Sequence, residues 1–293
     1  MSLVEQTIAR LKKQQARDAG KLEPIDRSPH VHAPGIAVER LEDTDSLARH
    51  ITVDNAALRA RGYFPEHEKD RQFADQYRRI KRPLIEKAML DATTRSESRV
   101  VMVTSALAGD GKTFTSINLA LSMALERDMA VLLIDADVAK RHVSAIFGLA
   151  EQRGLLDALV DEETEAESVI VPTTTRGFSI LPAGTPVAGT EELLSSNRMR
   201  KLMAGLCTRN PRRIILLDSP PLLVTNEARA LLRVAGQVVV VVRAEVTPRG
   251  AIEAAVAMLD ERQTGGVVLN QVQSKSAEQY YEYGTYGVTE KST

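Results

Sequence analysis

The chain of 293 residues contains no tryptophan, a single cysteine and only 4% aromatic residues. The lone thiol, Cys207, cannot form an internal disulfide, which excludes a disulfide framework and fits a reducing compartment. Long apolar runs are also missing, because the longest, Val238–Val242, falls far short of the roughly 20 residues that span a bilayer. The opening MSLVEQTIARLKKQ carries charges where a secretory signal is apolar. We therefore expect a cytoplasmic protein with no direct membrane span.

Neither sign of charge dominates, since 38 lysines and arginines balance 39 aspartates and glutamates. A balanced chain offers no overall field that would attract nucleic acid or an anionic membrane. Hydrophobic residues make up 43% of the chain, which is ample material for a core. The composition thus favours a globular protein that binds no nucleic acid.

The sequence pattern divides the chain into three parts. Residues 1–66 combine a short amphipathic helix, with apolar positions at Leu3, Val4, Ile8 and Leu11, and a polar, proline-containing linker. Residues 67–272 form the folded domain, which begins with a charged helix that we expect Pro83 to kink or divide. Residues 273–293 read as a tail.

Beyond Ser98, short apolar runs rich in β-branched residues alternate with longer helical patterns. Apolar runs that are continuous rather than alternating indicate strands buried on both faces. Regular strand–helix–strand alternation indicates parallel pairing with crossover helices. We predict an α/β fold of the P-loop NTPase type, a mostly parallel sheet with helices on both faces, flanked by flexible N- and C-terminal tails.

The segment SALAGDGKT, residues 105–113, follows the first strand and opens a helix, as a phosphate-binding loop does. Gly109 and Gly111 let backbone N–H groups curl around phosphate oxygens. Lys112 can reach the β- and γ-phosphates, and the Thr113 hydroxyl can ligate Mg²⁺. Ala106 replaces the first glycine of the usual pattern. The predicted nucleotide-binding residues of this segment are Ala108, Gly109, Asp110, Gly111, Lys112, Thr113 and Phe114.

Carboxylates follow two other predicted strands. VLLIDAD ends with Asp135 and Asp137, and IILLDSPP carries Asp218. A single Asp in such a place is often only a helix cap or a turn residue. Three of them beside a phosphate loop, at the edge of the sheet where ligands bind, favour a Mg²⁺–ATP site.

The order SALAGDGKT, LLIDAD, ILLDSPP and a tyrosine-rich end resembles the bacterial tyrosine kinases (BY-kinases) of polysaccharide export. The form DADVAK and the MSLVEQ start resemble the exosortase-associated autokinase branch. The resemblance implies ATP and Mg²⁺ as cofactors, and Asp135 as the base that deprotonates a tyrosine. It also implies Thr113, Asp137 and Asp218 as metal holders, with Lys112 and Asp137 assisting catalysis. Asn270, after the strand GVVLN, would read the adenine.

Four of the six tyrosines crowd into EQYYEYGTYG near the end of the chain. With no apolar partners around them, we interpret them as phosphate acceptors rather than as a packed strand. The predicted acceptors are Tyr280, Tyr281, Tyr283 and Tyr286. In the helix DQYRRIK, Asp75, Arg78 and Lys81 resemble the E-x-x-R-x-x-R motif that joins subunits of the family into a ring. An ordinary solvated face explains the helix equally well.

The resemblance implies a tyrosine autokinase that acts in trans within a homo-oligomeric ring and regulates exopolysaccharide assembly. It further implies a separate transmembrane polysaccharide co-polymerase as activator, which would hold the protein at the inner membrane. Two alternatives stay open. A ParA/MinD-like switch ATPase would carry a second lysine where this chain has Leu107. A nucleotide-bound scaffold remains open because Ala139 stands where many relatives have Arg.

Overall fold

The computed structural model describes residues 51–63, 68–90 and 96–272. Within them no helix is long and apolar enough to cross a membrane. The α-helices are α2 (Asn55–Ala60), α3 (Glu68–Leu90), α4 (Lys112–Ala124), α5 (His142–Ile146), α6 (Leu155–Val160), α7 (Thr190–Ser195), α8 (Asn197–Arg209), α9 (Asn226–Leu232) and α10 (Arg249–Val256). The 3₁₀ turns are η1 (Ser96–Arg99), η2 (Ala166–Val169) and η3 (Glu261–Gln263). The strands are β1 (Val100–Ser105), β2 (Ala130–Asp135), β3 (Val171–Pro172), β4 (Phe178–Leu181), β5 (Arg213–Asp218), β6 (Gln237–Arg243) and β7 (Thr264–Asn270).

The strands of the described residues form one seven-stranded sheet in the order β3-β4-β2-β5-β1-β6-β7. Every pairing is parallel except that of β3 with β4, which is antiparallel. The mostly parallel α/β fold predicted from the sequence is therefore confirmed. Because β1 lies between β5 and β6, the segments that follow β2, β5 and β1 come together at one edge of the sheet.

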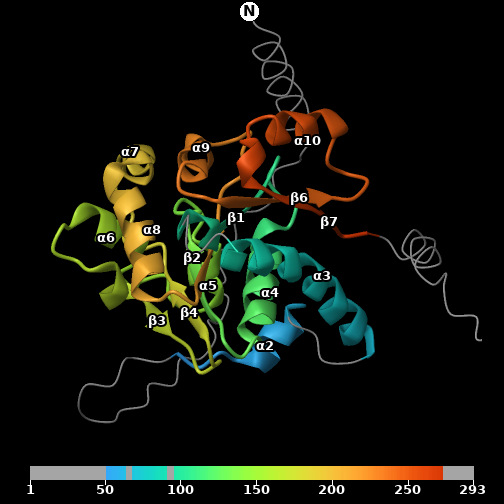
Figure 1. The fold of residues 1–293 in the computed structure, drawn as a ribbon, viewed down its shortest axis with the longest axis horizontal. Helices are drawn as coiled ribbons and strands as arrows, with labels where there is room; N and C mark the ends of the chain where they lie inside the picture. The colour runs from blue at the N-terminus through green and yellow to red at the C-terminus, as the bar shows by residue number, and fades with distance from the viewer. Residues whose placement is uncertain (1–50, 64–67, 91–95, 273–293) are drawn as a thin grey trace, which may run out of the picture. The chain divides into compact units, whose positions relative to one another are not determined.

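The sheet separates two apolar cores, and alternate residues of each strand point into different ones. In β1, Val100 and Met102 belong to one core, whereas Val101 and Val103 belong to the other. Helices α6 to α10 cover the first face and α2 to α5 the second, as Figure 1 shows for α8 on one side and α3 and α4 on the other. Burial on both faces explains why the strands read as continuous apolar runs.

Two sequence predictions need correction. Residues 51–63, assigned to the linker, belong to the packed fold, because Ile51 pairs with Thr173 and Leu58 is fully buried. The sequence does not reveal this packing, because so short a segment shows no helical or strand periodicity of its own. Pro83 lies inside α3, which continues to Leu90, so the predicted division of the helix at this residue is wrong. Packing of Leu84 and Ala88 in the second core accounts for that continuity.

Candidate active site

The predicted acidic residues meet at the carboxyl edge of the central strands. Asp135 ends β2 and Asp218 ends β5, and the two are direct partners in the register of this parallel pair. Val103 of β1 pairs with Asp218 from the other side, so the loop that follows β1 adjoins both carboxylates. The topology therefore assembles three segments that are far apart in the sequence into one site.

The loop between β1 and α4 has the backbone of a phosphate cradle. Gly109 and Gly111 have φ angles of 90° and 95°, a backbone conformation that residues other than glycine rarely adopt. A Cβ atom at Gly111 would lie 2.0 Å from Asn270 Nδ2. Gly111 is therefore required both for its backbone conformation and for the close approach of β7. Ala108 and Gly109 are exposed at the crest of the loop, where a phosphate group can reach the backbone.

Asp110 holds the loop to the last two strands. Its buried carboxylate accepts a hydrogen bond from Thr247 Oγ1 at 2.8 Å, and its carbonyl oxygen accepts one from Asn270 Nδ2 at 3.0 Å. Thr247 Oγ1 in turn accepts from the Arg243 amide, which directs the threonine hydrogen toward Asp110. The loop is thus braced by β7 and by the turn that follows β6 before any ligand binds.

Lys112 and Asp137 form a buried ion pair, with Nζ 3.3 Å from Oδ2. Apart from this ion pair, the Asp137 Oδ2 atom has no hydrogen-bond partner. The Lys112 side chain therefore lies beside the phosphate loop with its charge balanced by a carboxylate that has unused acceptor capacity.

Asp218 receives two hydroxyl hydrogen bonds from α4. Thr113 Oγ1 lies 2.8 Å from one carboxylate oxygen and Ser116 Oγ 2.9 Å from the other. Burial, and to a lesser degree the neighbouring charge of Asp135, raise the pKa of Asp218 to about 7. A carboxylate that is costly to ionise in the protein alone is one that gains from a nearby cation.

Asp135 is fully buried and asymmetrically bound. Its Oδ2 atom accepts hydrogen bonds of 2.7 Å from both the amide and the hydroxyl of Ser144, while Oδ1 has no partner. Burial is the main reason that the pKa of Asp135 is raised to about 6, and the Asp137 charge adds to it. A carboxylate with one free oxygen and a raised pKa is suited to accept a proton near neutral pH.

The residues fit a magnesium–nucleotide complex better than a protein-only metal site. Among the described residues, no group of three histidine, cysteine or acidic side chains could hold a metal ion without further ligands. Mg²⁺ in phosphoryl-transfer sites commonly uses one or two carboxylates together with water and substrate phosphates. The carboxylates of Asp137 and Asp218, which lie beside Lys112 and Thr113 of the phosphate loop, match that ligand set.

The predicted oligomer residues on α3 lie in two different environments. Asp75 and Arg78 are exposed and pair with each other. Lys81, in contrast, is buried, donates a hydrogen bond to the Ser122 carbonyl at 2.5 Å and pairs with Glu126 at 3.0 Å. Lys81 therefore anchors α3 to α4 within the chain, whereas Asp75 and Arg78 are exposed.

Phe114, the last residue of the predicted loop set, joins α4 to the preceding segments. Its ring lies 5.3 Å from that of Tyr63 and 6.1 Å from that of Phe73, measured between centroids. At these separations aromatic rings attract one another through dispersion and complementary edge and face charges. Phe114 thus packs the start of α4 against residues 51–63 and α3, which makes it a structural neighbour of the site.

Three residues near the site were missed from the sequence: Ser116, Ser144 and Thr247. Ser116 could have been found, because it follows Thr113 by one helical turn and so shares its face. Ser144 and Thr247 carried no local signal, since their contacts with Asp135 and Asp110 depend on the tertiary fold.

Ala139, which stands where many relatives have Arg, is exposed. Two residues further on, Arg141 donates a hydrogen bond from one guanidinium nitrogen to the Ala150 carbonyl at 3.0 Å.

Comparison with known proteins supports these observations. A family model described as an AAA domain matches residues 98–264. Tyrosine-protein kinase wzc of Salmonella typhimurium is 32% identical over 67% of this chain, but this chain spans only 27% of its length. Tyrosine-protein kinase YwqD of Bacillus subtilis is 32% identical over 73% of this chain and 86% of its own.

Solved structures show the same relationship. The kinase domain of VpsO is 31% identical, with a TM-score of 0.56, over 71% of this chain and 100% of its own. The kinase domain of the Escherichia coli tyrosine kinase ETK is 26% identical, with a TM-score of 0.54, over 63% of this chain and 74% of its own. On its sequence, its fold and the placement of its three motifs, this chain belongs to the bacterial tyrosine-protein kinase family.

Proposed function

We propose that the protein is an ATP- and Mg²⁺-dependent protein-tyrosine kinase that phosphorylates its own C-terminal tyrosines in trans. The observation that carries the proposal is the unpartnered Oδ1 atom of Asp135, buried beside a phosphate loop and in register with Asp218. A phenol with a pKa near 10 is a poor nucleophile at neutral pH until a positioned base accepts its proton.

ATP binds through the backbone of the loop that ends at Thr113. The amide groups around Gly109 and Gly111, where φ is positive, would hold the phosphates, and Lys112 would leave Asp137 for the β- and γ-phosphates. Asn270 would support the adenine end: its Nδ2 donates to the Asp110 carbonyl, and its Oδ1 would accept a hydrogen bond from the exocyclic amino group.

Thr113, Asp137 and Asp218 would hold Mg²⁺, directly or through water. When bound, the ion supplies positive charge that neutralises the phosphate oxygens during transfer. The Thr113 hydroxyl donates a 2.8 Å hydrogen bond to Asp218, so these two proposed ligands lie next to each other. Ser116 keeps the other oxygen of Asp218 in place.

The phosphoryl transfer then follows from the side chains of the site. The incoming tyrosine gives its hydroxyl proton to Asp135 Oδ1, and its oxygen forms a bond to the γ-phosphorus. The bond from that phosphorus to the bridging oxygen of ADP breaks, and ADP leaves with the electron pair. Asp135 is fully buried. The phenol would therefore reach Oδ1 only after Lys112 has left Asp137 for the nucleotide and has uncovered this edge of the sheet.

The proposed acceptors Tyr280, Tyr281, Tyr283 and Tyr286 lie outside the described residues. The 16 residues from Gln271 to Tyr286 can span roughly 50 Å when extended, enough to reach the site of a neighbouring subunit. Each phosphate adds about −1.5 to −2 charges. Several of them next to Glu278 and Glu282 should repel the tail from the acidic site and loosen a ring joined through Asp75 and Arg78.

We further propose that this kinase regulates exopolysaccharide assembly, and that a separate transmembrane chain-length determinant activates it at the inner membrane. The N-terminal segment 1–66, also outside the described range except for residues 51–63, supplies the contact through Met1–Lys13. Deletion of Met1–Lys13 should then abolish partner binding while phosphotransfer by the isolated protein persists.

The proposed kinase activity is tested by measuring phosphotyrosine on the purified full chain after incubation with Mg²⁺ and ATP. Wild type should gain phosphate, whereas Lys112→Met and a variant with the four tail tyrosines changed to Phe should not. Tyr63→Phe is the matched control, because Tyr63 lies outside the tail and phenylalanine preserves its ring contact with Phe114. ATP hydrolysis without phosphotyrosine in wild type would instead identify a switch ATPase, and nucleotide binding without turnover a scaffold.

A further inference from the structure

We propose that Ser144 is a positioning residue that holds Asp135 so that Oδ1, and not Oδ2, accepts the proton of the substrate tyrosine. This inference rests on the proposed kinase function. Ser144 lies in α5, in the segment that follows β2, and is 1% exposed. Its role follows from the hydrogen atoms available in its contacts.

A serine hydroxyl has one hydrogen to donate and lone pairs with which to accept. Ser144 Oγ accepts a hydrogen bond from the Ala183 amide at 3.0 Å, which occupies an acceptor position. Its single hydrogen is then free to point at Asp135 Oδ2, 2.7 Å away. The Ser144 amide donates to the same Oδ2 atom, also at 2.7 Å.

The two oxygens of Asp135 are thereby made unequal. Oδ2 receives two short hydrogen bonds, which stabilise negative charge on that atom and fix the rotation of the carboxylate. Oδ1 has no partner in spite of being buried. The only oxygen left to form a new bond to a hydrogen is Oδ1, so the serine selects the atom that acts as the base.

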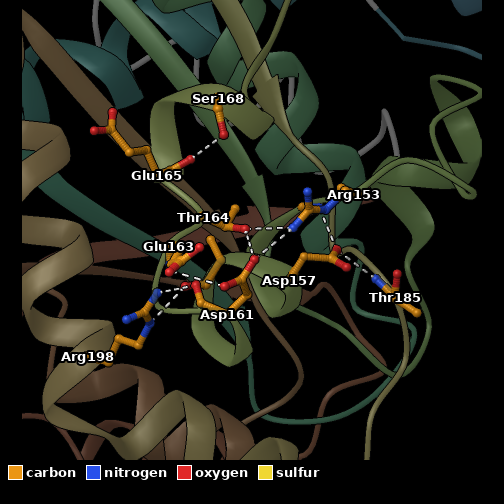
Figure 2. A network of polar contacts seen from close by, with 11 residues as sticks. Arg153, Asp157, Asp161, Glu163, Thr164, Glu165, Ser168, Thr185 and Arg198 are labelled. Atoms are coloured by element: carbon orange, nitrogen blue, oxygen red, sulfur yellow. Dashed lines mark hydrogen bonds and ion pairs between the residues drawn. The ribbon is translucent and has the colours of Figure 1, made fainter.

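The two peptide groups of Ala183 are themselves held by the start of α6. The Pro182 carbonyl, in the same peptide group as the Ala183 amide, accepts from the Leu155 amide at 2.8 Å, and the Ala183 carbonyl accepts from the Leu156 amide at 3.0 Å. Asp157 Oδ2 joins the same loop to α6 by accepting from the amides of Gly154 and Thr185. Figure 2 shows the Asp157 side chain directed at Thr185. Ser144 therefore joins Asp135, the proposed base, to the loop that follows β4, and hydrogen bonds to α6 hold this loop in place.

The test compares Ser144→Ala and Ser144→Thr in the full chain. Ser144→Ala keeps the amide bond to Asp135 but removes the hydroxyl, so kcat for tyrosine phosphorylation should fall about tenfold while KM for ATP stays within twofold. Ser144→Thr keeps an Oγ atom and should restore kcat to within about threefold of wild type. Thr173→Ala is the control, because it removes a buried hydroxyl that bridges the Thr175 amide and the Phe178 carbonyl at the opposite end of β4.

Crystal structures of Ser144→Ala and Ser144→Thr supply a readout that does not depend on activity. The Asp135 carboxylate should rotate in the alanine variant and keep its wild-type orientation in the threonine variant. An active wild type with an unchanged kcat in Ser144→Ala, an equal loss in Thr173→Ala, or an unmoved carboxylate would overturn the positioning role. An inactive wild type would overturn the proposed kinase function, and the orientation of Asp135 would still decide the role of Ser144.

Discussion

Lys112 Nζ lies 3.3 Å from Asp137 Oδ2 in a pair that is almost completely buried. Both residues are proposed to act on the Mg²⁺–nucleotide complex, so the pair must open when ATP binds. Before binding, each residue supplies the opposite charge that makes burial of the other tolerable. In the proposed mechanism the nucleotide replaces Asp137 as the partner of Lys112.

Removal of the Asp137 charge should therefore destabilise the ligand-free protein more than the nucleotide-bound one. In Asp137→Asn the buried Lys112 loses the carboxylate in direct contact with it, and the loss of one partner of a buried ion pair costs about 3–5 kcal/mol. ADP without Mg²⁺ supplies the missing negative charge, so the rise in Tm on adding ADP should be larger in the variant than in wild type. Differential scanning calorimetry with and without ADP measures both.

The matched control is Asp75→Asn, which neutralises an exposed carboxylate paired with Arg78. It should leave both the Tm and the increase caused by ADP within experimental error of wild type. Equal increases in wild type and Asp137→Asn would show that Lys112 does not exchange partners on binding nucleotide.

Gly111→Ala should impair nucleotide binding and stability together. The φ angle of 95° disfavours any side chain, at a cost of about 1–2 kcal/mol, and the new Cβ displaces Asn270 Nδ2, which lies 2.0 Å from its position. We expect at least a tenfold weaker Kd for a fluorescent ADP analogue and a lower free energy of unfolding in urea.

Gly205→Ala is the opposite case. Gly205 lies inside α8, where nothing lies within 4 Å of a Cβ atom. An alanine there should stabilise the protein by about 0.5–1 kcal/mol because alanine loses less backbone entropy in a helix. Similar outcomes for the two alanine variants would contradict the steric account of Gly111.

Lys81 should prove to be a stability residue. Lys81→Met leaves the buried Ser122 carbonyl without its 2.5 Å donor, at a cost of about 1–3 kcal/mol. Urea unfolding measures this loss, and light scattering measures oligomeric state in parallel. Arg78→Ala removes only an exposed ion pair with Asp75, worth at most about 0.5 kcal/mol.

The two variants separate packing from assembly. Arg78→Ala should keep the stability of wild type and, if α3 joins subunits, lower the oligomer mass. Two results together would reverse these assignments. Lys81→Met would be as stable as wild type but monomeric, and Arg78→Ala would keep the oligomer mass of wild type.

Asp157 should make stability depend on pH under acidic conditions. Burial opposes its ionisation, but hydrogen bonds from the Gly154 and Thr185 amides outweigh that effect and lower the pKa of Asp157. Because the folded-state pKa lies below the unfolded value, the stabilisation is complete above the ordinary pKa of about 3.9 and is lost as pH falls through the folded value. Asp157→Asn, which mimics the neutral acid, should be less stable than wild type at pH 7.

The stability difference between wild type and Asp157→Asn should then shrink as the pH drops below about 4. Urea unfolding at a series of pH values between neutrality and acid measures it. A difference that is constant with pH would mean that the carboxylate charge plays no part in holding the loop to α6.

The sequence determined much of the candidate site because its chemistry is local. The order strand, glycine-rich loop, Lys112 and Thr113 predicts the phosphate cradle, since one short segment supplies both the amide groups and the side chains. Acidic residues directly after apolar strands predict that Asp135 and Asp218 share an edge. The sheet confirms this placement through their direct pairing in register.

Only the tertiary structure decided how those residues are held. The bonds from Ser144 to Asp135 and from Thr247 to Asp110 join segments whose proximity depends on strand order, which local patterns do not reveal. Lys81 shows the same limit, because one charged residue on an amphipathic helix reads as surface until α4 is packed against it. Periodicity and motif spacing report which groups are present along the chain, whereas burial and hydrogen-bond direction arise from contacts between distant segments. That is why the sequence alone determined the kinds of chemical group at this site, and folding decided which atom of each group is free to react.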